Sequence, residues 1–149
     1  FNKDSKTIIL GSFPSVKSRE AGFFYAHPQN RFWKVIAGVF GEEVPLTVAE
    51  KKSLILNNGL ALYDSVYSCE ISGSSDASMR NVVPSDLKPI VQNSKISKVF
   101  VNGRTAEKYY NKYSLKRIGI ECTVLPSTSP ANAAWSLERL IDEWRVIKL

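Results

Sequence analysis

Four short apolar runs alternate along the chain with segments whose apolar residues recur at helical spacing. The runs are Ile8–Leu10, Leu60–Tyr63, Val99–Val101 and Thr123–Leu125. Each run ends at a polar or turn-forming residue, and continuous apolar runs of this length are typical of central strands that are covered on both faces. The pattern therefore predicts four buried strands.

The segments between and after these runs predict helices. Apolar residues recur at positions 32, 35, 36 and 39, which predicts a first helix. The stretch Thr47–Glu50 has the form of a capping box and opens a second helix that ends at 58–59. A third helix is predicted over residues 105–113, and a last one has its apolar side at positions 137, 140, 141 and 144. Strands that alternate with helices are joined by crossovers and run parallel. We predict one domain over residues 1–149 with an α/β fold, a three-layer sandwich around a central four-stranded, mostly parallel sheet.

This topology also predicts where the chemistry lies. In open parallel sheets, ligands bind in the crevice beyond the carboxyl ends of the strands. The segments that follow Leu10, Tyr63, Val101 and Leu125 are therefore the ones to inspect for functional side chains.

Composition narrows the class of partner. The 20 Lys and Arg residues exceed the 14 Asp and Glu residues, and the formal charge of +6 favours an anionic partner such as nucleic acid. No apolar run approaches the roughly 20 residues of a membrane-spanning helix, and the N-terminus has no secretory apolar segment, so we expect a soluble, cytoplasmic protein. Cys69 and Cys122 are expected to be reduced. With a single histidine and no metal-ligand spacing, we expect neither a metal nor another cofactor.

The segment Gly11–Arg19 leaves the first predicted strand with a glycine, a proline, three serines and two cations. Backbone amides and hydroxyls in such a turn can bind a phosphate, although an ordinary strand-to-helix turn would have the same composition. The segment is not a P-loop, because the Gly-Lys-Ser/Thr ending is missing.

The segment Gly22–Lys34 contains five aromatic residues and the only histidine of the chain. Aromatic rings near a strand end can stack on a flat heterocycle, and the amide of Asn30 can both donate to and accept from a base edge or a water molecule. We expect Phe32 and Trp33 to be core residues of the following helix. For His27 we favour a structural hydrogen bond over a role as general base.

Two further polar segments leave alternatives open. Leu125–Asn132 follows the last strand with three hydroxyls and precedes a helix, which suits an anion site but is also common loop composition. Ser72–Ser78 is either a surface loop or part of a pocket wall.

Three of these segments together resemble the uracil-DNA glycosylase superfamily, and most closely its hypoxanthine-DNA (deoxyinosine) glycosylase branch. They are Gly11–Ser15, Tyr25–Lys34 and Leu125–Asn132. The stretches Gly59–Val66, Ser68–Glu70 and Gly73–Asp76 are similar to the same branch, so the resemblance covers essentially the whole chain. The run His-Pro-Gln-Asn-Arg-Phe-Trp-Lys is also similar to mismatch-specific uracil-DNA glycosylases, and it identifies the superfamily better than the substrate.

The resemblance implies a base flipped into a pocket at the strand ends and hydrolysis of its N-glycosidic bond. It implies that Asn30 is the catalytic amide, acting through its carbonyl on water or through its amide on the base, with Ser12 as a second catalytic candidate. Tyr25 would stack on the base. The other implied substrate-binding residues are Gly11, Phe13, Asp64 and Ser127, and the implied DNA contacts are Ser15, Lys17, Ser129, Ala131 and Asn132.

Three positions depart from the superfamily pattern. Phe13 stands where many members have a water-activating Asp or Asn, and Ser127 stands where others have a His or Asn. Ala131 lies near the position of a bulkier wedge residue, so base extrusion would rely on damaged or weakly paired sites.

We predict a monomeric, monofunctional DNA glycosylase that acts on DNA containing deaminated bases, above all hypoxanthine, and that associates with the nucleoid when bound to DNA. One alternative is mismatch-specific uracil excision. A second is a catalytically silent nucleic-acid-binding domain.

Overall fold

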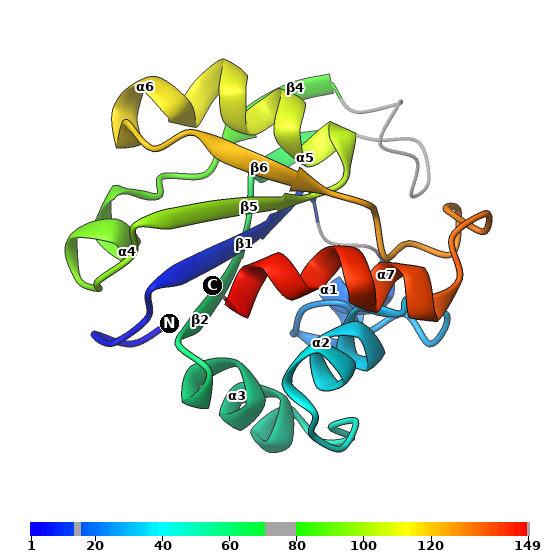
Figure 1. The fold of residues 1–149 in the computed structure, drawn as a ribbon. Coiled ribbons are helices and arrows are strands. Elements are labelled where there is room, and N and C mark those ends of the chain that lie inside the picture. The colour runs from blue at the N-terminus through cyan, green and yellow to red at the C-terminus, as the bar shows by residue number, and fades with distance from the viewer. Residues whose placement is uncertain (14–15, 71–79, 149) are drawn as a thin grey trace.

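The computed structural model describes residues 1–13, 16–70 and 80–148, and its centre is a four-stranded parallel sheet (Figure 1). The strand order is β2-β1-β5-β6, with all three neighbouring pairs parallel. The strands are β1 (Thr7–Gly11), β2 (Leu60–Asp64), β5 (Lys98–Asn102) and β6 (Cys122–Leu125). The positions of the predicted strands, their parallel arrangement and the α/β class are confirmed. The predicted burial of all four is wrong for β6, an edge strand on which Thr123 is exposed.

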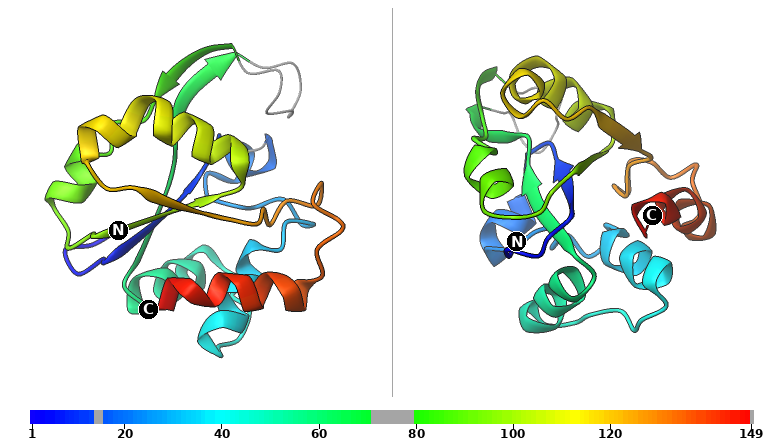
Figure 2. Two further views of the ribbon diagram at one scale, coloured as in Figure 1. Left: turned by 45° about the horizontal axis from the view of Figure 1, so that its top comes forward. Right: turned by 60° about the vertical axis from the view of Figure 1, so that its left-hand side comes forward.

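Helices cover both faces of this sheet, which confirms the three layers (Figures 1 and 2). One face carries α2 (Phe32–Phe40), α3 (Val48–Asn57) and α7 (Leu137–Trp144), and the other carries α4 (Lys88–Gln92), α5 (Arg104–Tyr109) and α6 (Leu115–Ile118). A short helix α1 (Val16–Ala21) follows β1, and a 3₁₀ turn η3 (Arg145–Lys148) follows α7.

Side chains of successive sheet residues alternate between two hydrophobic cores. Ile9 and Phe100 face α2 and α7, where Phe32 and Trp144 are fully buried. Ile8, Leu10, Val99 and Val101 face α5 and the helical turn after it. Because these strands are buried on both faces, they read in the sequence as continuous apolar runs.

The predicted helix over 105–113 was too short. After α5 the chain forms a π-helical turn, η2 (Tyr110–Ser114), and continues into α6. Gly119, which has a φ of +78°, ends this helical stretch. The predicted helix start at Thr47 is confirmed, because its Oγ1 accepts from the Glu50 backbone N–H at 3.1 Å. The Glu50 carboxylate accepts from the Thr47 hydroxyl at 3.0 Å.

An antiparallel pair of strands, β3 (Val66–Glu70) and β4 (Arg80–Pro84), forms a second sheet that was not predicted. Its register shifts twice, and Tyr67 and Val83 are exposed, so neither strand produces an apolar run. The stretch Ser72–Ser78 between them lies outside the described residues.

Among the described residues, no helix is long and apolar enough to cross a membrane. Within the same ranges, no group of three or more His, Cys, Asp or Glu side chains is arranged to hold a metal ion. Both cysteines belong to these ranges and are not joined by a disulfide.

Candidate active site

The carboxyl ends of the four parallel strands bring together residues from distant parts of the sequence. Gly11 ends β1, Asp64 ends β2 and Asn102 ends β5, while β6 leads into the loop 126–135. The loop before α2 supplies Asn30 to the same edge of the sheet, where it contacts Thr128.

Asn30 is held through its side-chain carbonyl. Its Oδ1 accepts from the Phe32 backbone N–H at 3.0 Å and from the Thr128 hydroxyl at 2.8 Å. A backbone N–H can only donate, so the atom facing it is the oxygen of the amide. Among the described residues, no acceptor binds Asn30 Nδ2, and this group is available to a ligand.

Thr128 is fully buried and is bound twice by Asn102. Asn102 Nδ2 donates to Thr128 Oγ1 at 3.0 Å, and the Thr128 backbone N–H donates to Asn102 Oδ1 at 3.1 Å. The end of β5 thus fixes the start of the loop that follows β6.

Arg31 forms hydrogen bonds to the rest of the loop that follows β6. Its guanidinium donates to the carbonyls of Asn132, at 3.0 Å, and Trp135. Its backbone N–H donates to the Thr128 carbonyl at 3.1 Å. Asn30 and Arg31 therefore both contact the loop in which the family resemblance implies DNA-binding residues.

Tyr25 lies with its ring stacked on Phe32, the ring centroids 3.9 Å apart and the planes 18° from parallel. Only the opposite face of the ring could contact a base. The Tyr25 hydroxyl is buried and has no hydrogen bond of normal geometry to the described residues. Burial, and then the charge of Asp64, raise the pKa of this hydroxyl far above its usual value, against a smaller opposing effect of Asn102. The phenol is therefore neutral.

The side chains of Asp64 and Tyr25 both lie against Gly11. A Cβ at this position would lie 2.6 Å from Asp64 Oδ1 and 3.1 Å from the Tyr25 hydroxyl oxygen. Only glycine leaves room for both side chains. Asp64 is 9% exposed, so its carboxyl is held inside the protein beside β1.

Of the two residues after Gly11, Ser12 contacts the start of β3 and Phe13 contacts Arg19 of α1. The Ser12 carbonyl accepts from the Val66 backbone N–H at 2.9 Å, and its side chain is partly buried. The Phe13 ring contacts the Arg19 guanidinium at 5.4 Å. Ser15 lies outside the described residues, and only the backbone of Lys17, in α1, is described.

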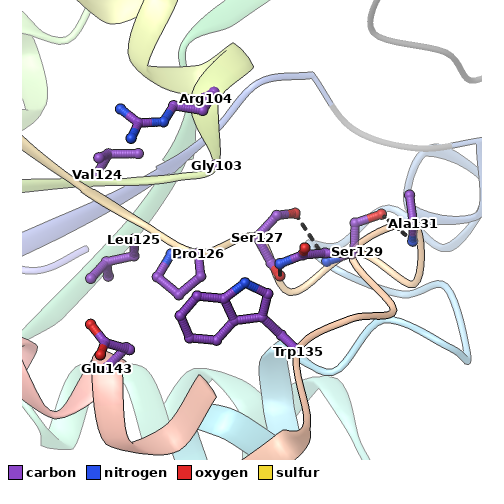
Figure 3. Close-up of a pocket in the computed structure, with 11 residues that line it drawn as sticks. Gly103, Arg104, Val124, Leu125, Pro126, Ser127, Ser129, Ala131, Trp135 and Glu143 are labelled. Atoms are coloured by element: carbon purple, nitrogen blue, oxygen red, sulfur yellow. Dashed lines mark hydrogen bonds between the residues drawn. The ribbon is translucent and has the colours of Figure 1, made fainter. Parts of the chain in front are cut away.

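The loop after β6 forms one wall of a pocket of about 610 Å³ (Figure 3). Ser127, Ser129, Ala131 and Asn132 line it together with Trp135. Ser127 Oγ accepts from the Ser129 backbone N–H at 3.1 Å, and Ser129 Oγ accepts from the Ala131 backbone N–H at 3.2 Å. Each hydroxyl keeps its own proton, which could be donated to a phosphate.

Asn132 and His27 have structural contacts. Asn132 Nδ2 donates to the Ser127 carbonyl at 3.0 Å and braces the loop. His27 Nδ1 accepts from the Gln29 backbone N–H at 3.1 Å, the kind of contact favoured for it from the sequence.

Sequence reasoning missed Asn102, Thr128 and Arg31 as parts of this site. Asn102 does end an apolar run at the ligand-binding edge, which was a usable signal. Thr128 was one of three equivalent hydroxyls in its segment, and only its burial distinguishes it.

The whole sequence matches a known family. The model of the uracil DNA glycosylase superfamily matches residues 1–148. The chain belongs to this superfamily. This confirms the resemblance that the three polar segments carry.

Individual members of the uracil DNA glycosylase superfamily are similar over nearly the full length. A protein of Methanosarcina acetivorans named hypoxanthine DNA glycosylase is 32% identical, over 98% of this chain and 92% of its own. A protein of the same name from Methanosarcina barkeri is 26% identical, over 88% of this chain and 83% of its own. The solution NMR structure of a candidate uracil DNA glycosylase from M. acetivorans superposes with a TM-score of 0.84 at 28% identity, covering 99% of this chain and 91% of that one. The fold predicted for the superfamily is thereby confirmed.

Proposed function

We propose that this protein is a monofunctional DNA glycosylase that hydrolyses the N-glycosidic bond of deaminated bases in DNA, with hypoxanthine as its main substrate. Membership of the superfamily and two similar proteins named hypoxanthine DNA glycosylase support the activity and the substrate. The formal charge of +6 suits a DNA substrate.

The observation that carries the mechanism is the orientation of Asn30. When the glycosidic bond breaks, the sugar gains positive charge and the base gains negative charge, so a donor directed at the base stabilises the transition state. Asn30 Oδ1 is already occupied by Phe32 and Thr128, and Nδ2 is the available end. Of the two roles open for this amide, the hydrogen bonds favour donation to the base over orientation of water.

Asp64 is the residue proposed to distinguish hypoxanthine and uracil from adenine and cytosine. Hypoxanthine and uracil each carry a ring N–H beside a carbonyl, where their parent bases adenine and cytosine have a bare ring nitrogen. An ionised carboxylate only accepts hydrogen bonds. Asp64 would accept from that N–H and be repelled by the ring-nitrogen lone pair of adenine or cytosine, while Gly11 leaves it room and Tyr25 offers a ring face.

The test is single-turnover base release from inosine-containing DNA by the wild type and by Asn30→Ala. We expect the variant to remain folded and to lose at least about 100-fold in rate, because it removes a donor to the base that matters mainly as the bond breaks. Its melting temperature should fall modestly, since the Phe32 N–H and the Thr128 hydroxyl lose their acceptor. Asn57→Ala, at an exposed position at the end of α3, is the matched control. Unchanged cleavage by Asn30→Ala would move the catalytic role to Ser12 or Asp64.

The same assay separates the alternatives. Phe13 and Ser127, which replace residues that assist uracil excision in relatives, favour weak release of uracil. Faster release of uracil than of hypoxanthine from mismatched duplexes would support the mismatch-specific alternative. Binding to all duplexes with no release of hypoxanthine, uracil or xanthine would support the silent nucleic-acid-binding domain.

We also propose that the enzyme acts as a monomer in the cytoplasm, bound to the nucleoid, and that it needs no metal or other cofactor. Full activity in excess chelator would support the absence of a metal, and a monomeric mass in solution would support the monomer. Ala131 is small for a residue that would wedge into the duplex as the base is extruded. Base release should therefore be faster from mispaired or single-stranded sites than from well-paired ones.

A further inference from the structure

A buried hydroxyl links two amide side chains across the candidate active site. Thr128 Oγ1 lies 3.0 Å from Asn102 Nδ2 and 2.8 Å from Asn30 Oδ1, and Thr128 is 0% exposed. The three residues come from the end of β5, the loop after β6 and the loop before α2, separated by 26 and 98 positions from Thr128.

Asn102, Thr128 and Asn30 form a row of hydrogen-bonded side chains, and two backbone amides fix the direction of every hydrogen bond in it. The Thr128 backbone N–H faces Asn102 Oδ1, so the other end of that amide, Nδ2, must face the Thr128 hydroxyl and donate to it. The hydroxyl has one proton and, having accepted from Asn102, directs it to Asn30 Oδ1. The Phe32 backbone N–H independently requires an oxygen at the same place. A flipped Asn30 amide would set Nδ2 against two donors.

We propose that Thr128, backed by Asn102, is the positioning residue that keeps the Nδ2 group of Asn30 directed at the leaving base. This rests on the proposed function, in which Asn30 is the donor. Bonds in such a row strengthen one another, and a carbonyl that accepts two of them makes its own amide N–H a better donor. A donor that is already oriented needs no rearrangement when negative charge develops on the base.

The test compares Thr128→Val with Thr128→Ser. Valine keeps the shape of threonine but cannot pass a proton to Asn30, whereas serine keeps the hydroxyl. We expect Thr128→Val to slow single-turnover base release at saturating enzyme at least tenfold, with DNA affinity changed less than twofold, and Thr128→Ser to recover most of the rate. Thr123→Val, on an exposed residue of β6, is the matched control and should release base at the wild-type rate.

A double-mutant cycle separates positioning from a structural role. If Thr128 acts through Asn30, then Thr128→Val should cause little further loss in an Asn30→Ala background, because the group it positions is gone. Full additivity of the two losses would overturn the proposal. So would an equal loss of rate in Thr128→Ser and Thr128→Val.

A spectroscopic readout makes the outcome independent of the substrate. In the wild type, the side-chain amide of Asn30 should give a rigid pair of ¹H–¹⁵N resonances with high heteronuclear NOE values. In Thr128→Val these values should fall, while those of Asn57 stay unchanged. Should the wild type release no base, the proposed function fails, and the amide dynamics alone then support or refute the role of Thr128.

Discussion

The Arg31 guanidinium donates to the backbone carbonyl of Asn132 at 3.0 Å, across 101 positions of sequence. The residue beside the proposed catalytic amide therefore holds the far end of the loop proposed to contact DNA. Together with the contact of Asn30 to Thr128, this makes the position of the loop and the position of Asn30 mutually dependent.

Replacing Arg31 by lysine should loosen this loop. A guanidinium reaches the Asn132 and Trp135 carbonyls at once, whereas an ammonium on a flexible stem does not present two donors in a fixed fork. We expect Arg31→Lys to destabilise the fold by about 1.5–3 kcal/mol, since a hydrogen bond to a charged group is worth this much. Hydrogen exchange should accelerate at 127–135, and base release should slow. Arg117→Lys, exposed on α6, should change neither quantity.

Tyr25 should act through its ring rather than through its hydroxyl. Because Phe32 covers one face and the hydroxyl is buried without a normal hydrogen bond, Tyr25→Phe keeps the free stacking face and should change base release little. Tyr25→Ala should weaken productive binding of damaged DNA by roughly 1 to 3 kcal/mol, the value of stacking on one base, with a smaller effect on undamaged DNA. Equal damage in the Phe and Ala variants would assign the function to the hydroxyl.

Gly11→Ala should disable the site by displacing Asp64. The added Cβ would lie 2.6 Å from Asp64 Oδ1, and this buried side chain has little room to move. The control is Gly38→Ala in α2, where a Cβ would lie 2.5 Å from the end of the Ile141 side chain, away from the site. We expect both variants to lower the melting temperature and only Gly11→Ala to abolish release of hypoxanthine. Normal activity in Gly11→Ala would contradict the proposed role of Asp64.

Stability should fall in alkali as two buried phenols ionise. Burial, with a smaller contribution from Cys122, raises the pKa of Tyr110 to about 12, and that of Tyr25 is raised further. Their folded-state pKa values lie above the unfolded value of about 10, so the stabilisation is complete below pH 10 and is lost as the pH rises through 12. Denaturant unfolding from pH 8 to 12, with phenolate absorbance, would measure this. Tyr110→Phe should show a shallower decline.

The fold was predictable because the inner strands β1 and β5 are buried on both faces and each of the four strands is marked by an apolar run. The location of several candidate binding residues was predictable too, since Gly11, Asp64 and the loop after Leu125 all follow such runs. The row Asn102, Thr128 and Asn30 was not predictable. Its hydrogen bonds depend on which of several polar loop residues is buried when three distant segments meet, and burial of a single hydroxyl leaves no periodic signal.

The strand pair β3 and β4 was not predicted because its sequence has no apolar run. Its side chains alternate with large exposed residues such as Tyr67, and its register shifts break the regular period of two. A strand pair that buries little apolar surface has a sequence close to that of a loop.

Phosphate anchoring is expected from the loops after β1 and β6, which leave the same edge of the parallel sheet. Lys17 is in α1, directly after β1, and Ser129 is in the loop after β6. Lys17→Ala should lower affinity equally for damaged and undamaged DNA and flatten the slope of log affinity against log salt by about one unit, because one counterion fewer is released. Ser129→Ala should lower affinity without changing the slope, since a neutral hydroxyl releases no counterion. Lys6→Ala, at the opposite end of β1, is the charge-matched control and should leave affinity and slope unchanged. An unaltered slope in Lys17→Ala, or an equal change in Lys6→Ala, would mean that DNA does not lie across this edge of the sheet.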